Sequence, residues 1–367
     1  ACGDVLGAGK PAGTVDWPSF RGPSASGVSE GFPTAADWDL ATGRNVLWNV
    51  PVPGLAHSSP VVQGERIFLT TAISEEEEAV FKLEKEEGDR RAYVWIKDLP
   101  PEGPHRFEIL CLDKWSGATL WSRTARVAAP YSKRHAKGTH ANPTPAVDAE
   151  RVVAYFGAEG LHCYDHAGNL LWEKDLGPLA AGYYVNPEIQ WGIASSPVLH
   201  DGRVMVLCDV LGDSFLAAFD ARTGAELWKV ARSDVPTWGT PTVDVAGGRS
   251  QVIVNGYDLI GGYDLESGRA LWTMVGGGAV PIPTPVVAHD LIFVTNAGGM
   301  PGGKSSSSQR APIFAVKADA TGEVVPEGRF MQWATPRGGN YIPSPLVYGE
   351  ELYCVTGSVL TCYAART

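Results

Sequence analysis

The feature that most constrains the fold is a repeated segment that ends in tryptophan. Its pattern is an apolar residue, Asp, three residues, Gly, three residues and Trp, with one residue fewer in the second of four copies. Asp accepts hydrogen bonds from turn amides, Gly supplies a positive φ, and Trp can cover a neighbouring unit. We therefore expect Trp121, Trp172, Trp228 and Trp272 to occupy equivalent structural positions. The copies are "LCLDKWSGATLW" (110–121), "HCYDHAGNLLW" (162–172), "AAFDARTGAELW" (217–228) and "GGYDLESGRALW" (261–272).

A second periodic signal consists of Ser/Thr-Pro pairs, each followed by an apolar stretch and then by a β-rich run such as "RVMVLC" (203–208). The last five of these prolines, at positions 145, 197, 241, 285 and 345, lie 52, 44, 44 and 60 residues apart. Such a period is typical of four-stranded propeller blades. The sequence therefore predicts an all-β fold, a β-propeller of four-stranded antiparallel blades with six visible repeats. The six starts are "HSSPVV" (57–62), "NPTPAV" (142–147), "SSPVL" (195–199), "GTPTV" (239–243), "IPTPVV" (282–287) and "IPSPLV" (342–347).

The two C-terminal copies are irregular. The fifth, "AVKADATGEVVPEGRFMQW" (315–333), reaches Trp333 only after a longer turn, and the last stops at "LTCYAART" (360–367). The missing Gly and Trp are present in "LATGRNVLW" (40–48). Because a closed ring has no exposed sheet edge, we expect this N-terminal strand to close the last blade. Residues 1–38 then form an N-terminal extension, and residues 39–367 a single propeller domain.

These repeats resemble the pyrroloquinoline-quinone-like (PQQ-like) β-propeller repeat family. The segments "DWPSFRGPSASGVS" (16–29) and "HANPTPAVDAERVVAYFGAEGL" (140–161) look like a secreted bacterial branch of uncharacterised function. The resemblance implies an extracytoplasmic propeller, and members often have seven or eight repeats. Members range from quinone-dependent alcohol dehydrogenases to a protein-binding lipoprotein of the barrel-assembly machine of the outer membrane.

The resemblance does not carry a cofactor with it. The dehydrogenases of this family have an adjacent Cys-Cys pair beside the quinone and a calcium ion held by carboxylate and amide ligands. Here no two cysteines are adjacent, and no matching cluster of Asp, Glu and Asn can be assigned. We therefore expect no cofactor and assign no catalytic residue. Binding of the quinone PQQ stays open as the alternative.

Charge and motifs exclude several other classes. The net charge of −11, without a dense Lys/Arg run, argues against nucleic acid as a partner. No apolar run approaches the roughly 18–20 residues that a membrane-spanning helix needs. None of the six cysteines forms a Cys-x-x-Cys pair, which excludes attached c-type haem and a zinc ribbon. The motifs of serine hydrolases, zinc proteases and phosphate-binding loops are also missing.

Two observations concern individual cysteines. Cys2 lies in the start "ACGDVLGAG", which could remain after processing of a secretion signal, so Cys2 is a candidate lipid anchor. A free terminal cysteine is the alternative. Cys354 and Cys362 lie symmetrically about Ser358 in an expected hairpin. They could face each other and form a disulfide, or remain two packed thiols.

The candidate ligand-binding residues lie just before the Ser/Thr-Pro pairs, where the innermost strands enter the central channel. Equivalent positions there should form rings around one mouth, as in a ligand pocket. The residues three positions before the prolines are His57, Asn142, Ala194, Trp238, Ile282 and Ile342. Those five positions before are Leu55, His140, Gly192, Pro236, Val280 and Asn340. From these we select His57, His140, Asn142, Trp238 and Asn340 as binding candidates and add Trp191 as a stacking platform. The alternative is that they fill the channel and bond to turns.

Two loops offer further hypotheses. In "YSKRHAKGTHANP" (131–143), His135 and His140 lack the third and fourth ligands of a metal site, so no metal is assigned. The basic residues Lys133, Arg134 and Lys137 of this loop could meet an anionic partner. Residues 73–107 are a Glu/Lys-rich insertion in the first repeat, either solvated or used to dock a partner.

The strong scaffold motifs and the missing catalytic ones predict a non-catalytic extracytoplasmic propeller. It would act as a protein-binding or scaffold module in the cell envelope, periplasmic or extracellular. Contact with a membrane would come only through the Cys2 anchor. The alternative from another class is a quinone-dependent dehydrogenase or a small-ligand sensor that uses the channel mouth.

Overall fold

The computed structural model describes residues 16–30, 35–76, 100–245, 249–276, 280–296 and 311–367. The only helices in these ranges are two single turns of 3-10 helix, η1 (Pro23–Ala25) and η2 (Gly157–Glu159). Neither is long and apolar enough to cross a membrane. Nearly all other regular structure there consists of β-strands, which confirms the predicted all-β class.

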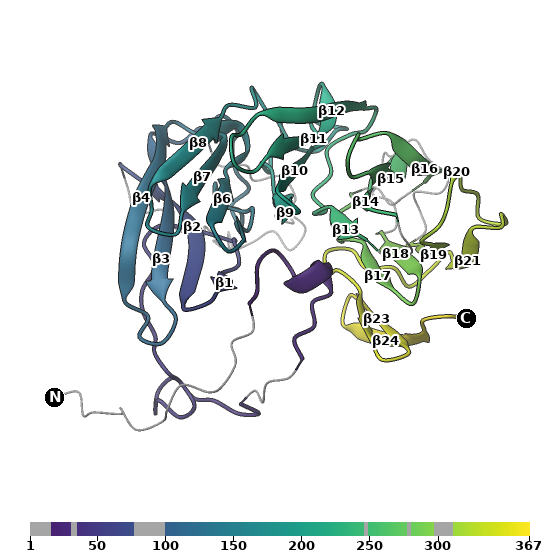
Figure 1. The fold of residues 1–367 in the computed structure, drawn as a ribbon, viewed down its shortest axis with the longest axis horizontal. Coiled ribbons are helices and arrows are strands. Elements are labelled where there is room, and N and C mark those ends of the chain that lie inside the picture. The colour runs from purple at the N-terminus through teal and green to yellow at the C-terminus, as the bar shows by residue number, and fades with distance from the viewer. Residues whose placement is uncertain (1–15, 31–34, 77–99, 246–248, 277–279, 297–310) are drawn as a thin grey trace, which may run out of the picture.

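The strands form six antiparallel sheets that follow one another along an arc (Figure 1). The first sheet contains β1 (Val61–Gln63), β2 (Arg66–Ser74), β3 (His105–Asp113) and β4 (Thr119–Ala128). The second contains β5 (Ala146–Val147), β6 (Arg151–Tyr155), β7 (Leu161–Asp165) and β8 (Leu170–Lys174). The third contains β9 (Val198–His200), β10 (Arg203–Cys208), β11 (Ser214–Asp220) and β12 (Glu226–Arg232).

The other three sheets depart more from a regular repeat. The fourth contains β13 (Thr242–Asp244), β14 (Gln251–Val254), β15 (Leu259–Asp264) and β16 (Ala270–Val275), and β20 (Gly322–Glu323) adds to it in parallel. The fifth contains β17 (Val286–Ala288), β18 (Leu291–Thr295), β19 (Ile313–Lys317) and β21 (Met331–Thr335). The sixth has three strands, β22 (Leu346–Tyr348), β23 (Glu351–Thr356) and β24 (Val359–Ala364).

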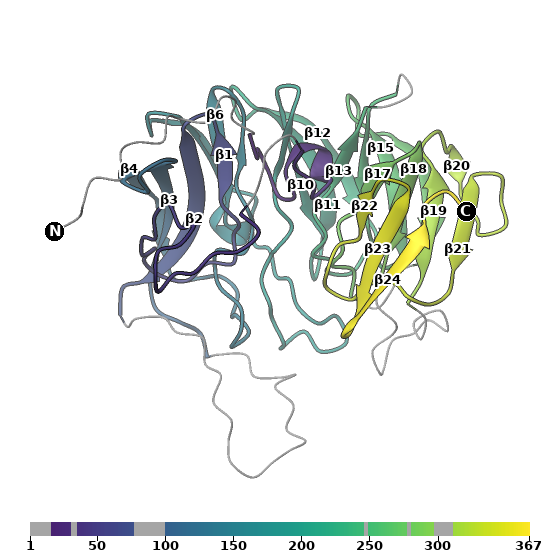
Figure 2. The same cartoon turned by 90° about the horizontal axis from the view of Figure 1, so that it is seen from below.

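Burial differs between the inner and outer strands of a blade. Five of the six residues of β10 are buried, whereas β12 alternates mostly exposed residues with the buried Trp228 and Arg232. An inner strand is covered on both faces by neighbouring sheets, so its sequence is apolar throughout. An outer strand has one solvated face, so its side chains alternate. Figure 2 shows the sheets standing side by side, as this pattern requires.

Tryptophan side chains join successive sheets in the repeated way that the motif predicts. Each indole N–H donates to the carbonyl that follows the aspartate position of the next sheet. The turn glycine lies under the ring: at Gly224, with φ +71°, a Cβ would lie 2.8 Å from the Trp172 ring, so only glycine fits. The bonds join Trp48 to Lys114, Trp121 to His166, Trp172 to Ala221, Trp228 to Leu265 and Trp333 to Ala365, with N···O distances of 2.8–3.0 Å.

Trp272 departs from the equivalence that we expected. It is buried, but its indole N–H donates to the Gln251 side chain of its own sheet at 3.0 Å. Gly322, the glycine it should cover, has no atom within 4 Å of the position of a Cβ. Instead β20, which contains Gly322, pairs in parallel beside Trp272. The longer turn of the fifth copy therefore changes this one contact between sheets.

The predicted closing strand does not pair with the last sheet. Residues 39–45 form a turn held by a bridge between Asp39 and Arg44, and β24 has no partner beyond β23 among the described residues. Trp48 lies over Gly117 and bonds to Lys114, both of the first sheet. In Figure 1 the sixth sheet lies apart from the first, on which Trp48 is anchored.

The N-terminal segment, residues 16–28, crosses the ends of the innermost strands. Trp17 and Val62 exchange backbone hydrogen bonds of 2.8 and 2.9 Å, and Pro18 accepts from Val147 N–H at 2.8 Å. At the other end of the segment, Arg21 Nη2 donates to the Pro345 carbonyl at 2.7 Å. Figures 1 and 2 both show η1 beside β13, which it contacts. This segment therefore links the first, second, fourth and sixth sheets.

A buried ionic cluster joins the third and fourth sheets. The Arg232 side chain has no exposed surface, and its Nε and Nη2 donate to Asp209 at 2.8 and 3.2 Å. Nη2 also donates to Asp234 at 3.1 Å, and Nη1 to the Tyr263 hydroxyl at 2.6 Å. The Thr237 hydroxyl donates to Asp209 at 2.8 Å. One guanidinium thus balances two buried carboxylates.

The two C-terminal cysteines are free thiols, as in the second alternative from the sequence, but only Cys354 is packed. Cys354 is buried and pairs with Thr361, whereas the exposed Cys362 pairs with Tyr353. The turn centres between residues 357 and 358 rather than on Ser358. A shift by one residue turns a side chain to the other face of a sheet, so the two sulfurs do not face each other.

Candidate functional site

The segments that lead into the innermost strands line a pocket of about 470 Å³, and we call it the mouth pocket. It lies where the chain enters β1, β5, β9, β13, β17 and β22. All six residues three positions before the repeat prolines line it: His57, Asn142, Ala194, Trp238, Ile282 and Ile342. The other lining residues are His135, Lys137, Gly138, Trp191, Val280 and Tyr341. Its volume lies within the range of small-molecule and side-chain pockets.

Aromatic rings form one wall of the mouth pocket. The ring centroids of Trp191 and Trp238 lie 5.2 Å apart, and Trp191 stacks on Tyr183 at 6.0 Å with an interplanar angle of 26°. The Trp238 indole N–H donates to the Gly192 carbonyl at 2.9 Å, which fixes that ring in place. Trp191, expected as a stacking platform, is therefore held between two other rings and still lines the pocket. Such preformed apolar surface favours binding because little side-chain entropy is lost.

Basic side chains form the other part of the rim. His57 Nε2 lies 2.7 Å from the Lys137 carbonyl, which only accepts, so this nitrogen carries a proton. His135 Nδ1 accepts from the Lys137 backbone N–H at 3.1 Å. These bonds tie the start of the first blade to loop 131–143 and place Lys137 at the pocket. None of the described lining residues is Asp or Glu.

Two of the candidate residues lie elsewhere. Asn340 has no exposed surface, and its side-chain oxygen accepts from Val355 N–H at 3.1 Å. His140 bonds to Glu102 beneath loop 131–143. His140 thus belongs to an ionic contact, and Asn340 accepts one backbone hydrogen bond while its Nδ2 has no partner among the described residues. The structure brings together the other four candidates, His57, Asn142, Trp191 and Trp238, and their role in binding remains a proposal.

Sequence reasoning missed the aromatic neighbours of the pocket. Tyr341 lines it, and Tyr183 supports Trp191 from the same loop. Tyr341 stands one residue before Ile342, outside the ring positions, so the repeat register gave no reason to select it. The abundance of aromatic residues in loops 183–191 and 341–342 was the available signal. Cys2 lies outside the described residues, as does most of the 73–107 insertion.

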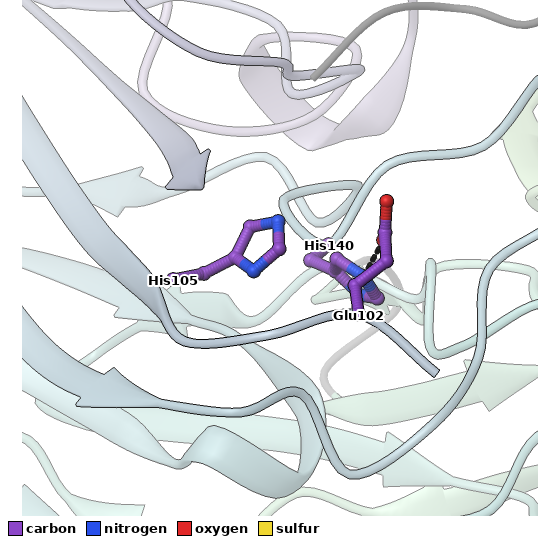
Figure 3. A group of neighbouring side chains, drawn as sticks. All are labelled: Glu102, His105 and His140. Carbon is purple, nitrogen blue, oxygen red and sulfur yellow. Dashed lines mark hydrogen bonds and ion pairs between the residues drawn. The ribbon is translucent and has the colours of Figure 1, made fainter. Parts of the chain in front are cut away.

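Loop 131–143 is held by an ionic network of Glu102, Arg134 and His140, and Figure 3 shows Glu102 and His140 with the neighbouring His105. Arg134 donates to both Glu102 oxygens at 2.8 and 2.9 Å, and His140 Nε2 lies 2.8 Å from Glu102 Oε2. The Arg134 side chain is 2% exposed. His105 packs edge-on against His140, with ring centroids 5.0 Å apart. Because His135 and Lys137 lie between Arg134 and His140 in the chain, this network fixes the basic rim.

Glu102, His105 and His140 also bring three potential metal-ligand atoms within 4.8 Å of one another. However, both Glu102 oxygens already accept from Arg134, whose fixed positive charge would repel a cation. His105 Nδ1 is engaged with the Gly103 carbonyl at 2.8 Å. His135, paired with His140 from the sequence, is at the pocket rim instead. We therefore do not interpret Glu102, His105 and His140 as a metal centre. We call the ionic network of Glu102, Arg134 and His140 the latch.

The latch should make the free energy of unfolding depend on pH in the acid range. Burial alone would raise the pKa of Glu102, but the bonds and charges of His140 and Arg134 lower it to about 2. A lowered pKa in the folded state stabilises the protein above the ordinary value near 4.5, and this contribution is lost as pH falls through about 2. We expect Glu102→Gln to flatten the pH dependence of urea unfolding between about pH 4.5 and 2, relative to the unchanged protein.

The matched control for this prediction is Glu150→Gln, since Glu150 is 69% exposed in its pair with Arg151. This exposed pair should contribute little, so the control should keep the acid dependence of the unchanged protein. If Glu102→Gln retained the full loss of stability in acid, the latch would not be the source of it.

Comparison with known proteins gives one family and several distant structures. A family model described as "Outer membrane protein assembly factor BamB" matches residues 105–273 and 212–310. Together these cover residues 105–310, which is 206 of 367 residues. Among curated proteins, none matches the chain.

Three solved structures illustrate the range of similar folds. BamB from Moraxella catarrhalis is 14% identical, with a TM-score of 0.42, over 72% of this chain and 71% of that chain. A europium-containing methanol dehydrogenase is 12% identical, with a TM-score of 0.44, over 76% of this chain and 50% of that one. A quinohemoprotein alcohol dehydrogenase from Comamonas testosteroni is 10% identical, with a TM-score of 0.43, over 96% and 72%.

Proposed function

Since the chain belongs to the PQQ-like repeat family of the outer membrane protein assembly factor BamB, we propose that it is a non-catalytic protein-binding module of the cell envelope. In this proposal the mouth pocket holds part of a partner protein, and the sheets serve as the scaffold. The proposed location is periplasmic or extracellular, with Cys2 as a lipid anchor. The excess of negative charge in the chain continues to argue against nucleic acid.

The observation that carries this proposal is the chemistry of the mouth pocket. Its walls are indole, phenol and aliphatic groups, which favour an apolar side chain. Among the described lining residues, Asn142 supplies the one side-chain amide and no residue supplies a carboxylate. Calcium needs six to eight oxygen ligands. The lining therefore suits contact with a protein better than it suits the metal and quinone of the alternative dehydrogenase.

Site-specific photo-cross-linking tests the proposal. A photoreactive phenylalanine analogue replaces Ile342, which lines the pocket and is 59% exposed. The matched control carries it at Leu171 on the outer strand β8. In living cells of the source organism, we expect a protein adduct from position 342 and none from position 171. Equal adducts from both positions would contradict a partner site at the mouth.

A second measurement addresses the alternative function. The purified chain is titrated calorimetrically with PQQ in the presence of calcium, and oxidation of alcohols is followed. We expect no binding heat and no turnover. Saturable binding with alcohol oxidation would overturn the non-catalytic proposal.

A further inference from the structure

The mouth pocket combines two features that together specify a type of ligand. Its floor and wall are apolar: Val280 is 2% exposed and Trp238 8%, and Trp191 packs against Trp238. Its rim carries Lys137, whose ammonium group forms no ion pair among the described residues. The pocket therefore offers an apolar cavity with a positive charge at its edge.

The charge of this rim is opposite to that of the whole chain. The chain has a net charge of −11, yet the described lining contains the cation Lys137 and no acid. The nearby Glu102 is neutralised by its bonds to Arg134 and His140. Burying an uncompensated charge is costly, so the favoured occupant brings an anion to this edge.

The geometry favours the end of a polypeptide over an internal segment. The N-terminal segment bonds to the innermost strands beyond the pocket lining: Pro18 accepts from Val147 and Arg21 donates to Pro345, five and three residues after the lining residues Asn142 and Ile342. A partner chain would therefore enter the mouth pocket from one side rather than pass along the axis. A chain terminus places a carboxylate on the same residue as an apolar side chain, which matches a cation beside an apolar cavity.

We propose that the mouth pocket binds the C-terminal residue of a partner protein, a residue with an aromatic or large aliphatic side chain and a free α-carboxylate. The side chain occupies the cavity beside Trp191 and Trp238, and the carboxylate accepts from Lys137. This inference rests on the proposed protein-binding function and adds the chemistry of the segment that is bound.

The backbone at Lys137 is held in place before binding, and its side chain is exposed. The latch formed by Glu102, Arg134 and His140 holds both ends of the short loop that contains it, and the bond from His57 to the Lys137 carbonyl holds its middle. A preformed site loses less entropy on binding than a site that must order itself. This organisation is what a receptor for a small terminal group requires.

Fluorescence polarisation with synthetic peptides tests the proposal on the full chain. The probe is a dye-labelled Gly-Ser-Gly-Ser-Gly-Phe peptide with a free C-terminus, compared with its C-terminal amide and with the peptide that ends in Ala. We expect saturable binding of the free-acid Phe peptide. Amidation should weaken peptide binding about tenfold because it removes a charged hydrogen bond. The change to Ala should weaken binding by a similar factor because it removes the apolar side chain.

Two variants assign these effects to the pocket. Lys137→Met should weaken the free-acid peptide about tenfold and leave the amide unchanged, so that the preference for the acid disappears. A simple loss of folding would weaken both peptides equally. Arg222→Ala, a cation on the exposed turn between β11 and β12, is the matched control and should bind both peptides as the unchanged chain does.

The outcomes separate this inference from the function it rests on. Equal affinity for the acid and the amide, or no saturable binding of any peptide, would overturn terminal-carboxylate recognition. Tighter binding of N-acetyl-phenylalanine than of the peptide would also overturn it and indicate a small-molecule site. If position 342 still formed a protein adduct in cells, the protein-binding function would stand while this inference failed.

Discussion

Replacement of Arg232 by methionine is expected to lower the free energy of unfolding by about 3–5 kcal/mol. The side chain is fully buried, and its removal leaves Asp209 and Asp234 without their shared cation. Burial and the neighbouring charge of Asp209 already raise the pKa of Asp234 to about 6, although the charge of Arg232 lowers it, so loss of Arg232 would further disfavour the ionised form of Asp234. Urea unfolding followed by tryptophan fluorescence at pH 7 measures the effect.

The matched control for this change is Arg222→Ala on the exposed turn, which should alter stability by less than about 0.5 kcal/mol. Adding Asp234→Asn to the Arg232→Met variant should recover part of the loss, since one uncompensated charge is then removed. An Arg232→Met protein with an unchanged unfolding midpoint would show that the cluster does not hold the sheets together. Thr237 bonds to Asp209 and precedes Trp238 in the chain. The Arg232→Met variant should therefore also increase the mobility of Trp238 at the mouth pocket.

Replacement of Trp228 by alanine is expected to cost about 3–5 kcal/mol. Trp228 is 8% exposed, packs in the core between the third and fourth sheets, covers Gly268 and donates to the Leu265 carbonyl at 3.0 Å. Its removal leaves a cavity and an unpaired carbonyl between two sheets. Trp228→Phe keeps most of the ring and should cost less. The same unfolding measurement, read by circular dichroism, compares the variants.

Trp38→Ala is the matched control, because Trp38 is 64% exposed and lies outside the repeat motif. It should change stability by less than about 0.5 kcal/mol. Similar losses of stability for Trp38→Ala and Trp228→Ala would mean that a tryptophan of the repeat motif contributes no more to stability than an exposed one. A small loss for Trp228→Ala alone would mean that neighbouring sheets are held chiefly by their other contacts.

The local repeat was enough to predict the class of fold and most strands. The run "RVMVLC" is β10, and the Asp220 carboxylate accepts from Thr223 N–H at 2.7 Å in the turn that the motif predicts. Such features depend on residues close together in the chain, where turn chemistry and alternation act directly. The departure of Trp272 was not foreseen, because it depends on where the distant Gly322 lies.

The candidate site was predictable in part for the same reason. Equivalent positions of a repeat lie at equivalent places, so the ring that contains His57, Asn142 and Trp238 follows from the spacing of the repeat prolines. The loops that complete the pocket differ in length and sequence between repeats. Hence Tyr341 was missed, and His140 and Asn340 were assigned to the mouth although buried polar groups use them.

The sequence by itself therefore determined the repeating unit: its strands, its turns and the tryptophans that join one sheet to the next. Tertiary structure alone decided that residues 40–48 do not pair with the last sheet. Trp48 anchors them on the first sheet, away from β24. It also decided that the Arg134 latch turns a basic loop into the rim of an apolar pocket. The physical reason is that a local motif specifies contacts over a few residues, whereas closure, buried charge pairing and pocket lining depend on the packing of distant segments.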